Sequence, residues 1–282
     1  MITQTIAGDL IPQIWETEVE YQQNPKRGVI KYVNDMGSKY FGPGKTINVP
    51  VIPFLPTANV KTTYPTVTYA DPTTTTVVQY TPTVIYTGFI LQEDTILTTL
   101  KDAVQLYAPL LAEGLYQKLD TDILGLHAST GATVADAGVW TYANFAVAGM
   151  TLMARGGDKV AQGDMMGIYH THTWDDWFNS TNVISAQVRG ETNGPAKTGV
   201  FDTVLGIRVF FTTNVVATGS LDTASASKNL IFARKWCWVV RKNTPKVEVE
   251  RTDLTTKVMA SHMMLAKVQH TALGVLHTVA TT

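Results

Sequence analysis

The spacing of apolar side chains changes period in the first half of the chain. Between Val78 and Tyr86 apolar residues alternate with glutamine and threonine, as in a strand with one covered face. Further on, apolar residues recur every three or four positions, which is typical of one stripe of a helix. A long strand leading into a long helix is therefore predicted. The stripe consists of Ile96, Leu100, Val104, Tyr107, Leu111, Leu115, Leu119, Ile123 and Leu126.

An extended arm is predicted ahead of this helix. Between Lys45 and Glu93 the only charged residues are Lys61 and Asp71, and the segment is rich in Thr, Val, Ile and Tyr, which favour strands. Two strands with no core of their own are marginal in water, so the arm should lie against another surface. We expect an outgoing strand at 46–52, a tip between 59 and 72, and a return strand at 73–91.

The helix should begin at Thr99, because Thr99 and Asp102 have the spacing of a capping box, and it should run to His127. Pro109 lacks a backbone donor and is expected to bend the helix or divide it in two. Residues 129–139, which are rich in glycine, alanine and threonine, are predicted as a loop.

The second half of the chain mixes helix and strand signals, which predicts an α+β fold. One helix is expected at 142–155 and another after Thr173 as its N-cap. Trp236 and Trp238 should share one face of a strand. Strands are predicted at 165–169, 206–213, 230–240 and 246–251, the last two joined by a turn at 243–245, with strand-like alternation in 258–279 and loops at 187–199 and 219–227.

The composition suits a folded chain whose surface is partly covered. Of 282 residues 45% are hydrophobic, enough for a core, but only 16% are charged, against roughly 25% in a typical soluble domain. A subunit of a large assembly fits this, as does a threonine-rich β-protein. Cys237 is the single cysteine, so no intramolecular disulfide is expected. No apolar run is long enough to span a membrane and no secretory signal follows Met1, so we expect a cytosolic product without a membrane partner.

The net charge of the whole chain is -1, so any attraction to phosphate must be local. Between Asn24 and Lys45 five lysine and arginine residues face one aspartate. We take Lys26, Arg27 and Lys31 of this segment as candidate DNA-facing residues. A solvated face, or contact with an acidic patch of a neighbour, explains the charges equally well. A second basic region runs from Lys228 to Arg251.

The most enzyme-like cluster is His170 and His172 followed by Asp175 and Asp176. Two imidazoles on one strand face plus a carboxylate are able to hold a metal. However, the HExxH pattern is missing, and two aspartates also stabilise a helix N-terminus. The other histidines, among them His277, have no carboxylate near them in the sequence, and no glycine-rich phosphate loop occurs. We therefore predict no catalytic, cofactor or metal residues, and keep a metal-dependent enzyme using His170 and His172 as an alternative.

Three stretches carry a resemblance to a known family: Ile11-Pro12-Gln13-Ile14-Trp15, the arm opening Gly44-Lys45-Thr46-Ile47-Asn48-Val49-Pro50-Val51-Ile52, and Val204-Leu205-Gly206-Ile207-Arg208-Val209-Phe210-Phe211-Thr212-Thr213-Asn214-Val215-Val216. In this order, with the threonine-rich return strand and the long helix, the chain resembles the major capsid proteins of tailed bacteriophages. The resemblance covers nearly the whole chain. It implies the Hong Kong 97 capsid fold, with an N-arm, an extended loop, a long spine helix in a peripheral domain, and an axial domain with a central sheet.

The resemblance also implies a division of the chain. The expected parts are an N-terminal arm at 1–39, the extended loop (E-loop) at 40–92, the peripheral domain with its spine helix at 93–140, the axial domain at 141–227, peripheral-domain strands at 228–262, and a return to the axial domain at 263–282.

The function implied by the resemblance is structural and not enzymatic. Subunits of the family form hexamers and pentamers of an icosahedral head around double-stranded DNA, so the virion, assembled in the host cytoplasm, is the expected location. A portal protein, a separate scaffolding protein and a decoration protein are expected partners. An encapsulin-like shell around protein cargo is the near alternative, and a tail or adhesin β-protein a more distant one. The expected E-loop contacts between subunits are Lys45, Asn59, Lys61, Tyr64, Asp71 and Tyr80.

Overall fold

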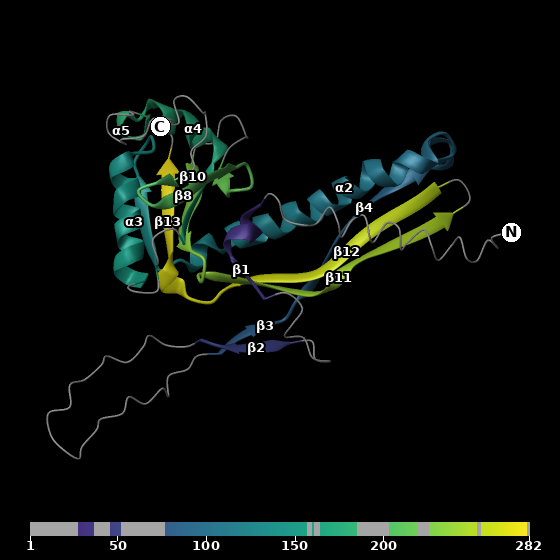
Figure 1. The fold of residues 1–282 in the computed structure, drawn as a ribbon, viewed down its shortest axis with the longest axis horizontal. Helices are drawn as coiled ribbons and strands as arrows, with labels where there is room; N and C mark the ends of the chain where they lie inside the picture. Colours follow the sequence, from purple (N-terminus) through teal and green to yellow (C-terminus); the bar gives the residue numbers. More distant parts are fainter. Residues whose placement is uncertain are drawn as a thin grey trace, which may run out of the picture.

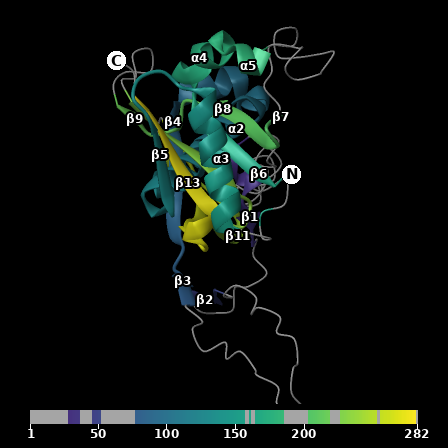
Figure 2. The same cartoon turned by 90° about the vertical axis from the view of Figure 1, so that its left-hand side faces the viewer.

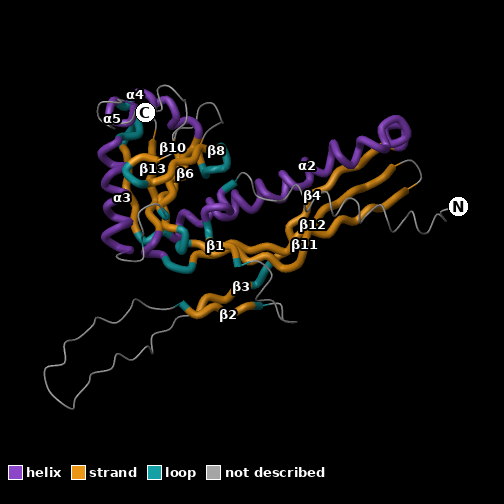
Figure 3. Tube along the Cα trace, viewed as in Figure 1, coloured by secondary structure: helices purple, strands orange, loops and turns teal. Residues whose placement is uncertain are grey.

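A computed structural model describes residues 28–36, 46–51, 77–156, 160, 164–184, 203–218, 226–252 and 255–280. The described residues form two sheets joined by one long helix (Figure 1). A four-stranded sheet lies along the outer length of this helix, and a seven-stranded sheet lies at its other end (Figure 3). A third, two-stranded sheet is set below them. The mixed α+β class predicted from the sequence is confirmed.

The long helix, α2, runs from Glu93 to Gly125, about 50 Å at 1.5 Å per residue. The predicted start at Thr99 is wrong, because Gln92 has extended backbone and the preceding strand enters the helix directly. Pro109 lies inside one continuous helix, which excludes the predicted division in two and leaves the predicted bend as the alternative. The apolar stripe explains this, since Leu111 and Leu115 are buried just beyond the proline and their packing offsets one missing backbone hydrogen bond.

The four-stranded sheet has the order β1-β11-β12-β4. Its strands are β1 (Asn34–Asp35), β11 (Cys237–Thr252), β12 (Thr255–Val268) and β4 (Thr83–Gln92). β1 pairs with β11 in parallel, and the other pairs are antiparallel. α2 packs on one face of this sheet (Figure 1).

Two strand predictions in this region are wrong. The predicted return strand is two strands, β3 (Val77–Tyr80), which pairs with β2 (Ile47–Pro50), and β4, which joins the four-stranded sheet. The predicted turn at 243–245 is an irregularity within β11, where Lys242 lies opposite Met263 but Lys246 lies opposite Ser261. β11 therefore carries two extra residues there, and a bulge accommodates a proline that a regular ladder would reject.

The seven-stranded sheet has the order β5-β13-β10-β6-β8-β7, and β9 pairs with β10. It includes residues predicted as a loop, because β5 pairs in parallel with β13. Short 3-10 helices connect several elements. The strands are β5 (Ala132–Asp136), β6 (Met165–His170), β7 (Thr203–Val204), β8 (Ile207–Thr212), β9 (Ala217–Thr218), β10 (Ala226–Ala233) and β13 (Gly274–Ala280), and the 3-10 helices are η1 (Val29–Tyr32), η2 (Leu126–Ser129), η4 (Thr171–Thr173) and η5 (Thr271–Leu273).

Both faces of this sheet are covered by the chain itself. Helix α3 (Tyr142–Gly156) lies across one face (Figure 2), together with the short helices α4 (Trp174–Asn179) and α5 (Thr181–Ile184). The opposite face shares its core with α2, η1 and the four-stranded sheet. The predicted helix at 142–155 is thus confirmed. Thr173 precedes α4 as predicted, but its hydroxyl donates to the His170 carbonyl oxygen at 2.8 Å and does not cap the helix.

The cores and the strand pairing revise two further predictions. Trp236 precedes β11 and is buried with Cys237 in the core under α2, whereas Trp238 packs against a separate small cluster, so the two indoles do not share a face. The predicted strand at 230–240 is two strands, because the chain leaves β10 of the seven-stranded sheet at Ala233 and enters β11 of the four-stranded sheet at Cys237, with residues 234–236 between them.

Candidate assembly surfaces

The outer face of the four-stranded sheet presents apolar side chains to solvent. Along β4, Ile85 and Phe89 pack against the core under α2. The alternate residues face the other way, and Val84, Tyr86 and Ile90 expose 57%, 72% and 63% of their surfaces. Alternation along a strand requires this division between two faces. The prediction that the alternate apolar residues from Val78 to Tyr86 lie on one covered face therefore holds only as far as Tyr80. Val84 and Tyr86 are exposed in a single subunit.

The neighbouring strand continues this outer face. On β12, Met263 lies opposite Val84, Ser261 opposite Tyr86 and Lys257 opposite Ile90. We call Val84, Tyr86, Ile90, Met259 and Met263 the apolar strip. Beside it, Lys246 and Glu248 of β11 form an ion pair at 3.1 Å, and Glu250 of β11 pairs at 3.3 Å with Lys257 of β12. Exposed pairs of this kind contribute little to stability. An apolar centre with a charged rim is the composition of a protein interface.

The base of the arm is fixed to its own subunit. Tyr80 is fully buried, and its hydroxyl donates to Gln269 Oε1 at 2.8 Å. Gln269 Nε2 in turn donates to the Pro50 carbonyl oxygen at 3.4 Å, and Lys267 Nζ donates to the Gln79 carbonyl oxygen at 3.1 Å. Burial raises the pKa of Tyr80 well above its ordinary value, so the hydroxyl remains a donor. Both strands at the base of the arm, β2 and β3, are thus anchored.

This geometry corrects the prediction that Tyr80 contacts a neighbouring subunit, because no surface of the side chain is left for a partner. Tyr80 instead packs with Met36, Val49 and Val240 in a small cluster under the arm. Sequence reasoning missed Gln269 because it lies 189 residues from Tyr80. Lys31 is described and exposed on η1. The remaining predicted residues lie outside the described ranges: Lys45, Asn59, Lys61, Tyr64, Asp71, Lys26 and Arg27.

The segment that carries Lys31 is anchored to α2. Gly28 has φ of +129°, a conformation that favours glycine, and it turns the chain so that the Val29 backbone N–H donates to Asp120 Oδ1 at 3.0 Å. Asp120 is buried, and this burial raises the pKa of its carboxyl to about 6, against the lowering effect of the backbone hydrogen bonds from Val29 and Ile30. Beyond η1, Asp35 on β1 forms an ion pair with Arg241 on β11.

The two histidines of the enzyme-like cluster are hydrogen-bonded to each other. The His172 backbone N–H donates to His170 Nδ1 at 3.2 Å, so His170 Nδ1 is an acceptor, and the two Nδ1 atoms lie 2.8 Å apart. These contacts use the lone pair of His170 Nδ1. Burial lowers the pKa of both imidazoles. Asp176 instead accepts the Trp140 backbone N–H at 3.0 Å. Within the described ranges no three His, Cys, Asp or Glu side chains gather as a metal site.

A second polar group unites Tyr169, His277 and Asp136. The Tyr169 hydroxyl lies 2.7 Å from His277 Nδ1, and His277 Nε2 lies 2.8 Å from Asp136 Oδ2. The order of groups is that of a nucleophile, base and orienting acid. All three are buried, so no substrate reaches the hydroxyl, and the chain of bonds joins β5, β13 and β6 in the interior. The prediction that His277 lacks a carboxylate partner is wrong, because parallel pairing places Asp136 beside it.

Hydrogen bonds hold the Asp136 carboxylate in its charged form. Burial alone would raise its pKa, but bonds from His277, Thr141 and Asn144 outweigh this and hold the pKa below its usual value. The Thr141 hydroxyl donates at 2.7 Å. Burial raises the pKa of Tyr169 well above its ordinary range. This group therefore fixes the register of three strands and is structural.

Comparison with known proteins places this architecture. No protein-family model and no curated protein sequence matches the chain. Among solved structures, one from Mycobacterium phage Che8 is 16% identical, with 89% of this chain and 91% of that chain covered and a TM-score of 0.65. The capsid structure of the cyanophage P-SCSP1u is 14% identical, covering 91% and 89%, with a TM-score of 0.62.

A virus-like particle from Pyrococcus furiosus is similar over 95% of this chain and 99% of that chain, at 11% identity and a TM-score of 0.58. No described helix has the length and apolar character needed to cross a membrane. Because the likeness covers the four-stranded sheet, the long helix and the seven-stranded sheet together, it is a likeness of the complete architecture. The chain therefore has the fold of phage capsid proteins.

Proposed function

We propose that this protein is the major capsid subunit of a bacteriophage, and that its hexamers and pentamers build an icosahedral head around double-stranded DNA. The observation that carries the proposal is the apolar strip on a fold shared with phage capsids. A single subunit leaves this large apolar surface in water. Burying it on contact stabilises an assembly by about 25 cal/mol per Å² of apolar area. Association with further copies removes that area from water.

The occupant of the strip, in this proposal, is the arm of a neighbouring subunit. The arm is a two-stranded extension with few charges beyond its base, and two strands alone are marginal in water. The arm's base is held rigidly by Tyr80 and Gln269, which fixes the direction in which the arm leaves its own subunit. Each copy has one nearly uncharged arm and one apolar strip. In a closed ring the arm of each copy covers the strip of the next.

The proposed division of labour follows the sheets. The four-stranded sheet with α2 is the peripheral part, the seven-stranded sheet is the axial part, and the arm is the E-loop. A portal, a separate scaffolding protein, a decoration protein and packaged DNA are the proposed partners, with the virion as the location and the host cytoplasm as the place of assembly. Catalysis has no part in this function.

Electron microscopy with sedimentation tests the proposal. Wild-type protein, expressed alone and with its neighbouring genes, should give closed shells or free hexamers and pentamers. Tyr86→Asp with Ile90→Asp should keep the subunit folded but leave it unassembled, because assembly would then bury two charges at the interface. Met150→Asp is the matched control, since Met150 is an exposed apolar residue on α3. Monomers from the wild type under both conditions would overturn the proposal.

A shell around protein cargo is the second candidate, favoured by the similarity to the virus-like particle from Pyrococcus furiosus. The shell-forming surfaces would be the same, so the contents decide between the two. Shells purified from infected or co-expressing cells should contain nuclease-protected DNA if the first proposal holds. Protected protein without nucleic acid would favour the second.

A further inference from the structure

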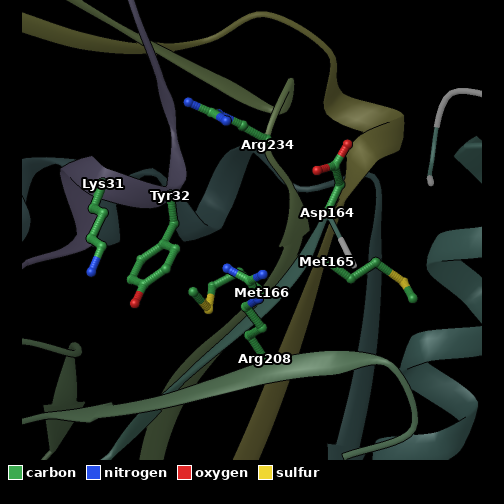
Figure 4. A pocket seen from close by; sticks show the side chains of 7 residues that line it. All are labelled: Lys31, Tyr32, Asp164, Met165, Met166, Arg208 and Arg234. Carbon is green, nitrogen blue, oxygen red and sulfur yellow. The ribbon is translucent and has the colours of Figure 1, made fainter. Parts of the chain in front are cut away.

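A basic cavity opens at one end of the seven-stranded sheet, on the face that also packs against η1. Its volume is about 120 Å³. Three cationic side chains, Lys31, Arg208 and Arg234, line it together with Asp164 and Tyr32 (Figure 4). The floor is apolar, because Met166 lies between the charged groups.

The order of the strands brings Asp164, Arg208 and Arg234 to one end of the seven-stranded sheet. β6 begins directly after Asp164, and the parallel strand β8 places Arg208 beside Met166. The antiparallel strand β10 ends at Ala233 opposite Met165, which brings the next residue, Arg234, to the same end. The Arg234 backbone N–H donates to the Asp164 carbonyl oxygen at 3.3 Å. Three strands from distant parts of the sequence thus deliver polar residues to one end of the sheet.

Residues of η1 form the opposite wall of the cavity, and contacts with α2 hold η1 in place. Val29 and Ile30 of η1 are buried, and the Val29 backbone N–H donates to Asp120. Lys31 is exposed, whereas the Tyr32 ring packs against the core beside Phe210. Lys31 Nζ lies 5.7 Å from the centre of the Tyr32 ring, a cation–π distance. Figure 4 shows both side chains extending in the same direction, with the Tyr32 ring between Lys31 and Met166. The cavity therefore has a built wall and not a loose surface lysine.

Among the described residues, the positive charges that line this cavity outnumber the negative ones. Among the described residues Arg241 is paired with Asp35 and Lys118 with Asp122, but no ion pair forms at Lys31, Arg208 or Arg234 within that part of the chain. Three cations face one acid. Like charges around a shared cavity create a positive potential that an anion relieves. Two guanidinium groups offer the planar pairs of donors that match phosphate oxygens.

We propose that this cavity binds a phosphate group of the nucleic-acid backbone. Arg208 and Arg234 supply the charge-assisted donors, Lys31 adds a third charge, and the Tyr32 hydroxyl is an additional donor. The inference rests on the proposed enclosure of DNA, and it assigns one contact point on each subunit. It requires no base recognition, because the charged donors reach only phosphate chemistry.

The test is the salt dependence of DNA binding by the full-length protein. Fluorescence anisotropy with short labelled duplex DNA, between about 50 and 200 mM salt, gives the slope of log affinity against log salt. Arg208→Gln with Arg234→Gln should lower the magnitude of this slope by about 0.9 for each phosphate that the variant no longer neutralises. Arg155→Gln, an exposed arginine on α3 across the sheet, is the matched control and should leave the slope unchanged.

Two further probes separate the sources of an anion. Phosphorus NMR of inorganic phosphate reports on free phosphate, and displacement of DNA by polyglutamate reports on carboxylates. Loss of phosphate binding in the double variant with an unchanged DNA slope would overturn the nucleic-acid assignment, as would polyglutamate competing better than phosphate. Electron microscopy of the same samples keeps the two proposals apart. Normal shells with an unchanged DNA slope defeat only the cavity, whereas a missing shell with a reduced slope defeats only the capsid proposal.

Discussion

The two large sheets differ in how completely one subunit covers them. The seven-stranded sheet has α3 on one face and the shared core with α2 on the other, and Asp136 accepts a hydrogen bond from His277 in its interior. Among the described residues the four-stranded sheet has a helix on one face only, and its outer face carries the apolar strip. If the chain assembles as proposed, the stability of the subunit and its assembly depend on different parts of the molecule. Substitutions should be able to separate them.

The largest effect is expected where α2 serves both sheets. Leu111 exposes 2% of its surface and the adjacent Leu110 exposes 56%. Leu111→Asp should cost about 4 kcal/mol or more, because it places a charge in the shared core. Circular dichroism and solubility should show an unfolded or aggregated chain. Leu110→Asp is the control, and its spectrum should match the wild type. Native-like Leu111→Asp protein would mean that α2 is not the common support.

The next effect tests the covered sheet alone. Asp136→Ala removes the acceptor for His277, Thr141 and Asn144 and should cost about 3 kcal/mol in urea unfolding at neutral pH. The pKa of Asp136 is lowered in the folded state, so its contribution is present above the unfolded pKa of about 3.9 and is lost as pH falls through the lower folded value.

The pH dependence provides the check on this prediction. Wild-type stability should fall on acidification below about pH 4 more steeply than that of Asp136→Ala. Parallel curves for the two proteins would show that the carboxylate does not act as described.

A smaller effect of opposite sign is expected at the anchor of η1. Because burial raises the pKa of Asp120 to about 6, the charged form costs stability. The favourable contribution is complete below the unfolded pKa and is lost as pH rises through about 6. Asp120→Asn keeps an acceptor for Val29 and should abolish this loss, gaining at most about 3 kcal/mol at pH 8 relative to the wild type. Unfolding curves at about pH 5 and 8 measure it, and an unchanged pH dependence would contradict it.

The smallest effect on the subunit is expected on the uncovered face. Tyr86→Thr keeps strand propensity and removes only exposed apolar surface, so the free energy of unfolding should change by less than about 0.5 kcal/mol. Shell yield, measured by sedimentation, should nevertheless fall. If Tyr86→Thr lowered the free energy of unfolding but still formed shells at the wild-type yield, the outer face would serve stability and not assembly.

Local periodicity predicted much of this molecule from sequence. The stripe of α2, the helix at 142–155 and the strands at 165–169 and 206–213 depend on neighbours within a few residues, and all are found. The start of α2 was mispredicted because a strand that enters the helix directly outweighs a capping pattern at Thr99. The arm's return strand was mispredicted because β3 and β4 have the same alternation but different pairing partners.

The candidate sites were harder to predict from the sequence, because each depends on residues that come into contact only after folding. Tyr80 and Gln269 are 189 residues apart, and Asp136 and His277 are 141 apart. Arg208 and Arg234 become neighbours of Lys31 only through strand order. In contrast, the histidine pair near Thr173 was visible in the sequence because it is local, and its geometry gives the metal-enzyme alternative no support.

The direct passage from β4 into α2 has a mechanical consequence. β3 is followed after Thr81 and Pro82 by β4, and β4 continues into the helix at Glu93 without a connecting loop. A force on the arm is therefore transmitted through β4 to helix α2, which is about 50 Å long. The direction of the arm and the tilt of α2 are thus mechanically coupled within one chain.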